Sequence, residues 1–160
     1  MTSPPAQGAG QHAGQSPPGG SAEQRRAERI MLDLLSQRLG RSLQPEKISH
    51  KSGAMVEVDG TDADRTILVE CWAHQGPPKA AQRHKILADA FKLAWISGSI
   101  NPRPRLILCL SDHQAAAPFL PVARTWAAAA LADHDIDVQL VELPADIRQV
   151  LIRAQLRQYR

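Results

Sequence analysis

The stretch Ile67-Leu68-Val69-Glu70-Cys71-Trp72 decides the fold class, because both of its faces are apolar apart from one carboxylate. A short run of this kind is typical of a central strand that is covered on both sides. The residues from Ala54 to Asp59 alternate as an earlier strand, and turn-forming residues at 59–64 connect the two runs. We therefore expect an antiparallel hairpin whose second strand, Thr66 to Ala73, lies inside a sheet.

Helical and strand patterns on both sides of this hairpin predict the rest of the architecture. Apolar residues at helical spacing, ended by Gly40, predict an amphipathic helix over Ala22 to Leu39. After the hairpin we expect a helix over Lys79 to Ile96 and a strand over Arg105 to Leu110. An Ala-rich helical region then reaches Ala132, interrupted near Pro118 and Pro121, and is followed by a strand over Ile136 to Leu143 and a last helix opened by Pro144. This order predicts an α/β fold with a mixed sheet flanked by helices.

Composition divides the chain into a leader and one domain. The 160 residues are 43% hydrophobic and 22% charged, with a formal net charge of +3, yet residues 1–22 contain no Asp, Glu, Lys or Arg and are rich in Pro and Gly. We expect 1–22 to be a disordered leader and 23–160 to be a single domain. No apolar run reaches the roughly 18 residues of a membrane span. The leader does not resemble a signal peptide, and Cys71 and Cys109 lie in apolar runs, so we expect a cytoplasmic protein.

Glu70 is the residue that points to chemistry, because a buried ionised carboxylate must be paired or bind a metal. Partners in an antiparallel hairpin have residue numbers with a constant sum, here expected at about 125 or 127. Such a register places Glu57 opposite Glu70 or one diagonal away, with Asp59 nearer the turn. Two close carboxylates repel unless a divalent cation such as Mg²⁺ or Mn²⁺ holds them, so Glu57, Asp59 and Glu70 are the expected metal ligands. The alternative is a Glu70 satisfied by an arginine or a helix end.

The order of elements and motifs carries a resemblance to a known superfamily. An amphipathic helix, then Lys51-Ser52-Gly53-Ala54 leading into the hairpin, then Leu68-Val69-Glu70-Cys71-Trp72, a helix and a strand resemble the restriction-endonuclease-like PD-(D/E)XK phosphodiesterases. The resemblance covers about Glu23 to Leu110. It implies an α-β-β-α-β core, followed here by a further helix, a strand and a C-terminal helix. It also implies metal-dependent hydrolysis of a nucleic-acid phosphodiester.

The same resemblance assigns roles to individual residues. Glu70 takes the second acidic position of the family, and Glu57, or less well Asp59, takes the first. The family's lysine, two residues after the second acid, is replaced by Trp72. Some members supply this amine from the following helix, where Lys79 and Lys85 stand, so these two lysines are the candidates for stabilising the developing negative charge.

Plainer interpretations of the charged residues stay open. Gln82, Lys85, Asp89 and Lys92 fall on one arc of the expected helix, as a solvated polar stripe would. Arginines recur on the first and last expected helices, at Arg25, Arg26, Arg29, Arg153, Arg157 and Arg160, where they either contact phosphate or face solvent. The alternative function is therefore a non-catalytic module that binds nucleic acid or protein. A homodimer also stays open. Trp72, Trp95 and Trp126 lie in core-like segments, which argues against a stacking platform for single strands.

Overall fold

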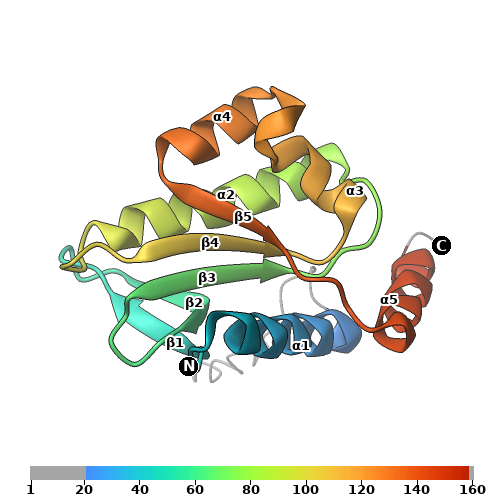
Figure 1. Cartoon of the computed structure of the whole chain (residues 1–160), viewed down its shortest axis with the longest axis horizontal. Coiled ribbons are helices and arrows are strands. Elements are labelled where there is room, and N and C mark those ends of the chain that lie inside the picture. The colour runs from blue at the N-terminus through green and yellow to red at the C-terminus, as the bar shows by residue number, and fades with distance from the viewer. Residues whose placement is uncertain (1–20, 159–160) are drawn as a thin grey trace, which may run out of the picture.

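The computed structural model describes residues 21–158, and Figure 1 shows one sheet between two layers of helices. Residues 1–20 of the expected leader lie outside the described residues. The last two residues assigned to that leader belong to the first helix, because Ser21 is its N-cap and Ala22 its first residue. Within the described part of the chain, no helix is long and apolar enough to cross a membrane.

The sheet has five strands in the order β1-β2-β3-β4-β5. These strands are β1 (Gln44–Ser49), β2 (Met55–Thr61), β3 (Ile67–Trp72), β4 (Arg105–Leu110) and β5 (Ile136–Leu140). The first three form an antiparallel meander, and β4 and β5 continue the sheet in parallel with β3. The expected mixed sheet is confirmed. All six residues of β3 are buried, which confirms that this strand is central and covered on both sides.

The helices lie close to the residue ranges that the periodicity predicts. They are α1 (Ala22–Leu39), α2 (Ala80–Ser97), α3 (His113–Ala116), the 3-10 turns η1 (Ala117–Phe119) and η2 (Pro121–Ala123), α4 (Trp126–Asp133) and α5 (Ala145–Gln158). The expected interruption of the Ala-rich region is confirmed, because Pro118 and Pro121 provide no backbone N–H for helical hydrogen bonds and lie in the 3-10 turns. The helix C-cap predicted at Gly40 is confirmed, with a φ of 62°.

Each face of the sheet has its own hydrophobic core. Helices α1 and α5 cover the face that carries Val69 and Cys71, and α2, α3 and α4 cover the face that carries Leu68 and Trp72 (Figure 1). The side chain of Cys71 therefore lies on the opposite face from its neighbour Glu70, which contacts α2. The two cores place α1 and α2 on opposite sides of β3.

The register of the β2–β3 hairpin differs from the expected one. The two strands pair at Gly60 with Val69 and at Thr61 with Leu68. Continuing this register brings Asp59, not Glu57, opposite Glu70. The expected register was wrong because β2 extends two residues beyond Asp59, so the turn lies later in the chain than the aspartates at 59–64 suggest.

Candidate functional site

Glu70 lies on the α2 side of β3 and is only 4% exposed. Its Oε1 atom is 2.8 Å from Nζ of Lys92, which also donates a hydrogen bond to the carbonyl oxygen of Glu57 at 2.9 Å. Oε1 is buried and forms no hydrogen bond of regular geometry, so its contact with Lys92 is an ion pair. The charge of Glu70 is thus balanced by a lysine from the following helix rather than by an arginine or a helix end.

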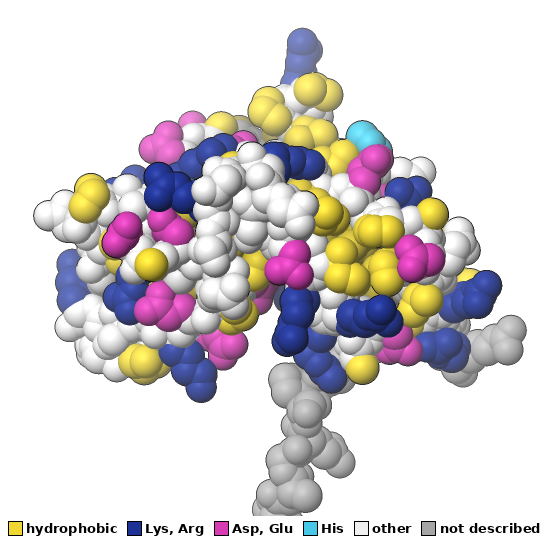
Figure 2. Space-filling model, turned by 60° about the horizontal axis from the view of Figure 1, so that its bottom comes forward, with side chains coloured by type: hydrophobic (Ala, Val, Ile, Leu, Met, Phe, Trp, Pro, Cys, Tyr) yellow, Lys and Arg dark blue, Asp and Glu magenta, His cyan; other side chains and the backbone are white. Residues whose placement is uncertain are grey.

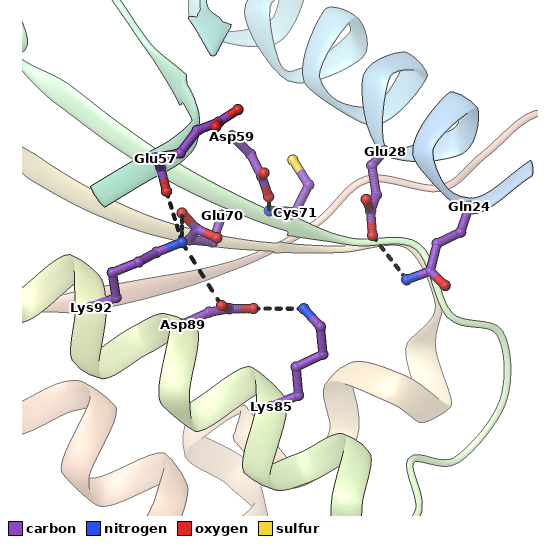
Figure 3. A network of polar contacts seen from close by, with 9 residues as sticks. All are labelled: Gln24, Glu28, Glu57, Asp59, Glu70, Cys71, Lys85, Asp89 and Lys92. Atoms are coloured by element: carbon purple, nitrogen blue, oxygen red, sulfur yellow. Dashed lines mark hydrogen bonds and ion pairs between the residues drawn. The ribbon is translucent and has the colours of Figure 1, made fainter. Parts of the chain in front are cut away.

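Asp59 is the second carboxylate at this position. Its Oδ2 atom accepts a hydrogen bond from the backbone N–H of Cys71 at 2.8 Å (Figure 3). Backbone pairing between β2 and β3 is confined to residues 60–61 and 68–69, so this side chain takes the place of a strand partner next to Glu70. The sheet is open at this point, and side chains from both of its faces reach the gap.

Glu57, the expected partner of Glu70, does not point into this gap. Its side chain is exposed, and in Figure 3 its carboxylate is directed away from Lys92. It takes part through its backbone carbonyl alone among the contacts drawn there. The correction follows from the register: the acid that shares the space with Glu70 is Asp59.

Both helical layers add charges to the cluster. From α1, Glu28 accepts a hydrogen bond from Nε2 of Gln24 at 3.1 Å. From α2, Lys85 forms an ion pair with Asp89 at 3.1 Å, and Asp89 lies 4.0 Å from Nζ of Lys92. We use the name acidic cluster for Glu28, Asp59, Glu70 and Asp89, which surround the amines of Lys85 and Lys92 (Figure 3).

Burial raises the pKa of Glu28, Asp59 and Glu70, and the charges of neighbouring carboxylates add to this effect. Burial, followed by the charge of Asp59, raises the pKa of Glu70 to about 8, and Lys92 opposes only part of this rise. Burial, with a smaller contribution from Asp59, raises the pKa of Glu28 to about 7. Burial also raises the pKa of Asp59, against the hydrogen bond from Cys71 and the charge of Lys92. Several perturbed carboxyl groups in one place are typical of a functional site.

The two lysines proposed from the sequence occupy different places. Lys79 is exposed and is the N-cap of α2, where its backbone N–H donates to Oε1 of Gln82 at 2.7 Å. Lys85 lies further along α2, and its side chain is in the network of Figure 3. Burial lowers the pKa of Lys85, but the charges of Asp89, Glu28 and Asp59 more than offset this effect. Lys85 therefore faces the acidic cluster as a stable cation.

Two cavities flank the acidic cluster. One, of about 220 Å³, lies between the start of α1, the end of β3, α2 and α5, and includes Lys85 and His74 in its wall. The other, of about 430 Å³, lies between α1 and the β1–β2 hairpin; Glu28 and Asp59 line it together with Arg25 and Arg29. Figure 2 shows a hollow in this face with basic side chains gathered beside it. Glu28 and Asp59 therefore line a cavity whose wall also carries positive charge, whereas Glu70 is buried behind Lys92.

The residues around Glu70 offer carboxylate oxygens but no complete protein cage for a metal. In the described part of the chain, no group of three or more His, Cys, Asp or Glu side chains is arranged to hold a metal. Mg²⁺ usually takes only one or two carboxylates and completes its shell with water and substrate phosphate. Asp59 and Glu70 provide such a pair, and Oε1 of Glu70 lacks a regular hydrogen bond. The fit requires Lys92 to leave that oxygen.

Other surface residues depart from the sequence-based expectations. Arg157 forms an ion pair with Glu23 at 2.8 Å, joining α5 to α1, so part of the basic face of the last helix is used within the fold. Arg160 lies outside the described residues. Trp126 is 73% exposed at the start of α4, which corrects its expected place in the core. The ring of Trp72 is buried, as expected.

Comparisons with protein-family models, with curated proteins and with solved structures found no match. The function is therefore inferred from the chain's own residues and their geometry.

Proposed function

We propose that the protein hydrolyses phosphodiester bonds in nucleic acid, using Mg²⁺ or Mn²⁺ held by Asp59 and Glu70. The observation that carries this proposal is the meeting of these two carboxylates at the gap between β2 and β3, beside lysines from the next helix. The order of α1, a meander, α2 and β4 supports a restriction-endonuclease-like core, in which β1 is a strand additional to the expected α-β-β-α-β order.

The residues around the gap divide the chemistry between them. A bound Mg²⁺ would lower the pKa of a water molecule and neutralise charge on the phosphate. Asp59 is fixed for this role by its hydrogen bond from Cys71, and Glu28 adds a third carboxyl group from α1. Lys85 supplies the positive charge that the missing motif lysine would provide, because Trp72 occupies that position.

Nucleic acid is the substrate that best fits the surroundings of the cluster. Arg25 and Arg29 line the same cavity as Glu28 and Asp59. A polyanion held by these arginines along α1 would bring its phosphates to the carboxylates. The free, buried Cys71 and Cys109 agree with a reducing compartment such as the cytoplasm.

A non-catalytic binding module is the second candidate. The 2.8 Å ion pair between Lys92 and Glu70 gives the buried carboxylate a structural partner, and Trp72 removes the usual lysine. In this alternative the cluster stabilises the fold, and the arginines of α1 bind nucleic acid or a protein partner.

One set of cutting and binding assays distinguishes the two proposed functions. Plasmid and oligonucleotide substrates are incubated in Mg²⁺ or Mn²⁺ with the wild type, Glu70→Gln, Asp59→Asn and the control Glu57→Gln. We expect metal-dependent cutting that falls by about a hundredfold or more in Glu70→Gln and Asp59→Asn. Glu57→Gln should keep metal-dependent cutting, because the Glu57 carboxylate is exposed and makes none of the contacts drawn in Figure 3. Glu57 lines the same cavity as Asp59, so this variant can change substrate binding while the metal requirement stays. Salt-dependent binding without cutting, unaffected by Glu70→Gln, would instead support the binding module.

A further inference from the structure

Lys92 covers the carboxylate oxygen that a metal would need. Its Nζ atom is 2.8 Å from Oε1 of Glu70, while the Lys92 side chain is 27% exposed and the Glu70 side chain 5% exposed. The lysine thus stands between solvent and the buried carboxylate. The sequence alone does not distinguish Lys92 from the other polar residues on its side of the helix. Lys92 reaches Glu70 because α2 packs over the gap beside Asp59.

An ammonium group and a divalent cation cannot occupy the same side of one oxygen. Coordination requires direct contact with the oxygen's lone pair. A charge of +2 attracts Asp59 and Glu70 more strongly than a charge of +1, and this attraction opposes the larger cost of removing water from the divalent ion. The ammonium has other partners nearby, since the carbonyl oxygen of Glu57 is at 2.9 Å and Asp89 at 4.0 Å. The flexible stem of lysine lets the head group move while α2 stays in place.

We propose that Lys92 is an internal counter-cation that a divalent metal displaces from Glu70, so that the lysine and the metal compete for one carboxylate oxygen. Metal loading then frees an ammonium group beside the site, where the carbonyl oxygen of Glu57 and the carboxylate of Asp89 hold it. Without metal, Lys92 keeps the buried carboxylate paired. This inference rests on the proposed function, because it concerns the same metal site.

The test measures metal affinity rather than hydrolysis. Mn²⁺ binding is followed by electron paramagnetic resonance or calorimetry in the wild type, Lys92→Met, Lys92→Arg, Glu70→Gln and Arg83→Met. We expect Lys92→Met to lower the Kd for Mn²⁺ by about tenfold or more, which corresponds to about 1.4 kcal/mol or more. Lys92→Arg keeps the competing charge and should show no gain. Arg83→Met removes one positive charge from the same helix at an exposed site lining a separate cavity, and should leave the Kd unchanged.

A second measurement needs only the wild type, in case Lys92→Met folds poorly with an unpaired Glu70. Reductive methylation of lysines is followed by peptide mass spectrometry with and without Mg²⁺. Lys92 should be modified faster with Mg²⁺, while Lys51, an exposed lysine at the β1–β2 turn, should be unchanged.

The outcomes distinguish this inference from the proposed function. A wild type that binds Mn²⁺ and cuts nucleic acid, with Lys92→Met binding no more tightly and Lys92 no more reactive in Mg²⁺, overturns the displacement alone. Absence of Mn²⁺ binding in every variant overturns the metal site and, with it, the displacement. Binding that persists in Glu70→Gln would place the metal elsewhere and overturn both.

Discussion

Burial of a carboxylate between two hydrophobic layers costs free energy unless a proton, a cation or hydrogen bonds compensate for it. Glu70 has one cation at 2.8 Å but also two acidic neighbours, Asp59 and Asp89, that act against its ionisation. The residue is thus poorly satisfied as a structural ion pair. A fold that only needed stability would gain from an apolar side chain here, since well-packed hydrophobic replacements of buried ion pairs are often neutral or stabilising.

Because the pKa of Glu70 is raised, we expect the free energy of unfolding to depend on pH. Its pKa is about 8 in the folded state against 4.5 for an unperturbed glutamate, and that of Glu28 is about 7. Between these limits the folded state binds more protons than the unfolded state, so the free energy of unfolding should decrease as pH rises from about 4.5 to 8. Glu70→Gln should reduce this decrease by up to roughly 4 kcal/mol.

Urea denaturation in metal-free buffer at several pH values measures this effect. The matched control is Glu57→Gln, which changes an exposed carboxyl on the neighbouring strand and should follow the wild type. If the free energy of unfolding changed with pH to the same extent in the wild type and in Glu70→Gln, the pH dependence could not be assigned to Glu70.

The sequence allowed the choice of Glu70, but it ranked Glu57 above Asp59 as the neighbouring acid and did not identify Lys92 as the ion-pair partner. An acidic residue inside an apolar strand can be recognised from the sequence. Asp59, in contrast, lies among turn-forming aspartates, and only the hairpin register distinguishes it from Glu57. Glu28 and Lys92 come from helices on opposite faces of the sheet. Their meeting depends on packing over long sequence separations, which periodicity does not describe.

At the scale of elements, β1 is the strand that periodicity does not predict. Its sequence, Gln44-Pro45-Glu46-Lys47-Ile48-Ser49, buries only Ile48 fully and carries a proline and two charges. These are the features with which edge strands avoid pairing with other chains. The helices and inner strands were predictable because each buries a continuous apolar stripe or face. The other edge strand, β5, was predictable because Ile136, Val138 and Leu140 pack into one core, whereas β1 lacks this signal.

The close approach of α1 to β2 gives a prediction at this scale. A Cβ atom added at Gly60 would collide with Cδ1 of Leu32, a buried residue of α1. Gly60→Ala should therefore lower the free energy of unfolding by about 1–3 kcal/mol, since overpacked cores must shift side chains or backbone. Chemical denaturation measures the change.

A double-mutant cycle identifies the cause of that destabilisation. Leu32→Ala alone should also destabilise the protein, by leaving a cavity. Combined with Gly60→Ala it should cost less than the sum of the two, because the shortened side chain leaves room for the new methyl group. Strict additivity would show that Gly60 is required for its backbone conformation rather than for the approach of α1.

For the whole molecule, the gap between β2 and β3 is where three layers of the fold meet. The sheet contributes Asp59 and Glu70, α1 contributes Glu28 from one face, and α2 contributes Lys85 and Lys92 from the other. Residues distributed in this way cannot be brought together until the sheet and both helical layers have packed. The assembled site is therefore a property of the complete domain, and its surroundings on α1 decide which molecules approach it.

The arginines of α1 make the last prediction, which concerns the approach of a polyanion. Arg25 and Arg29 lie on the wall of the cavity that contains Glu28 and Asp59, so phosphates bound there neutralise charge next to the cluster. The double variant Arg25→Ala/Arg29→Ala should weaken binding to oligonucleotides of any sequence and lower the slope of log K against log salt by about 1 for each arginine that no longer binds a phosphate. Fluorescence anisotropy at several salt concentrations measures both quantities. Arg83→Ala, on the side of α2 that faces α4, is the matched control and should change neither. Equal weakening in the two variants would mean that the nucleic acid responds to net charge alone, and the path along α1 would have to be abandoned.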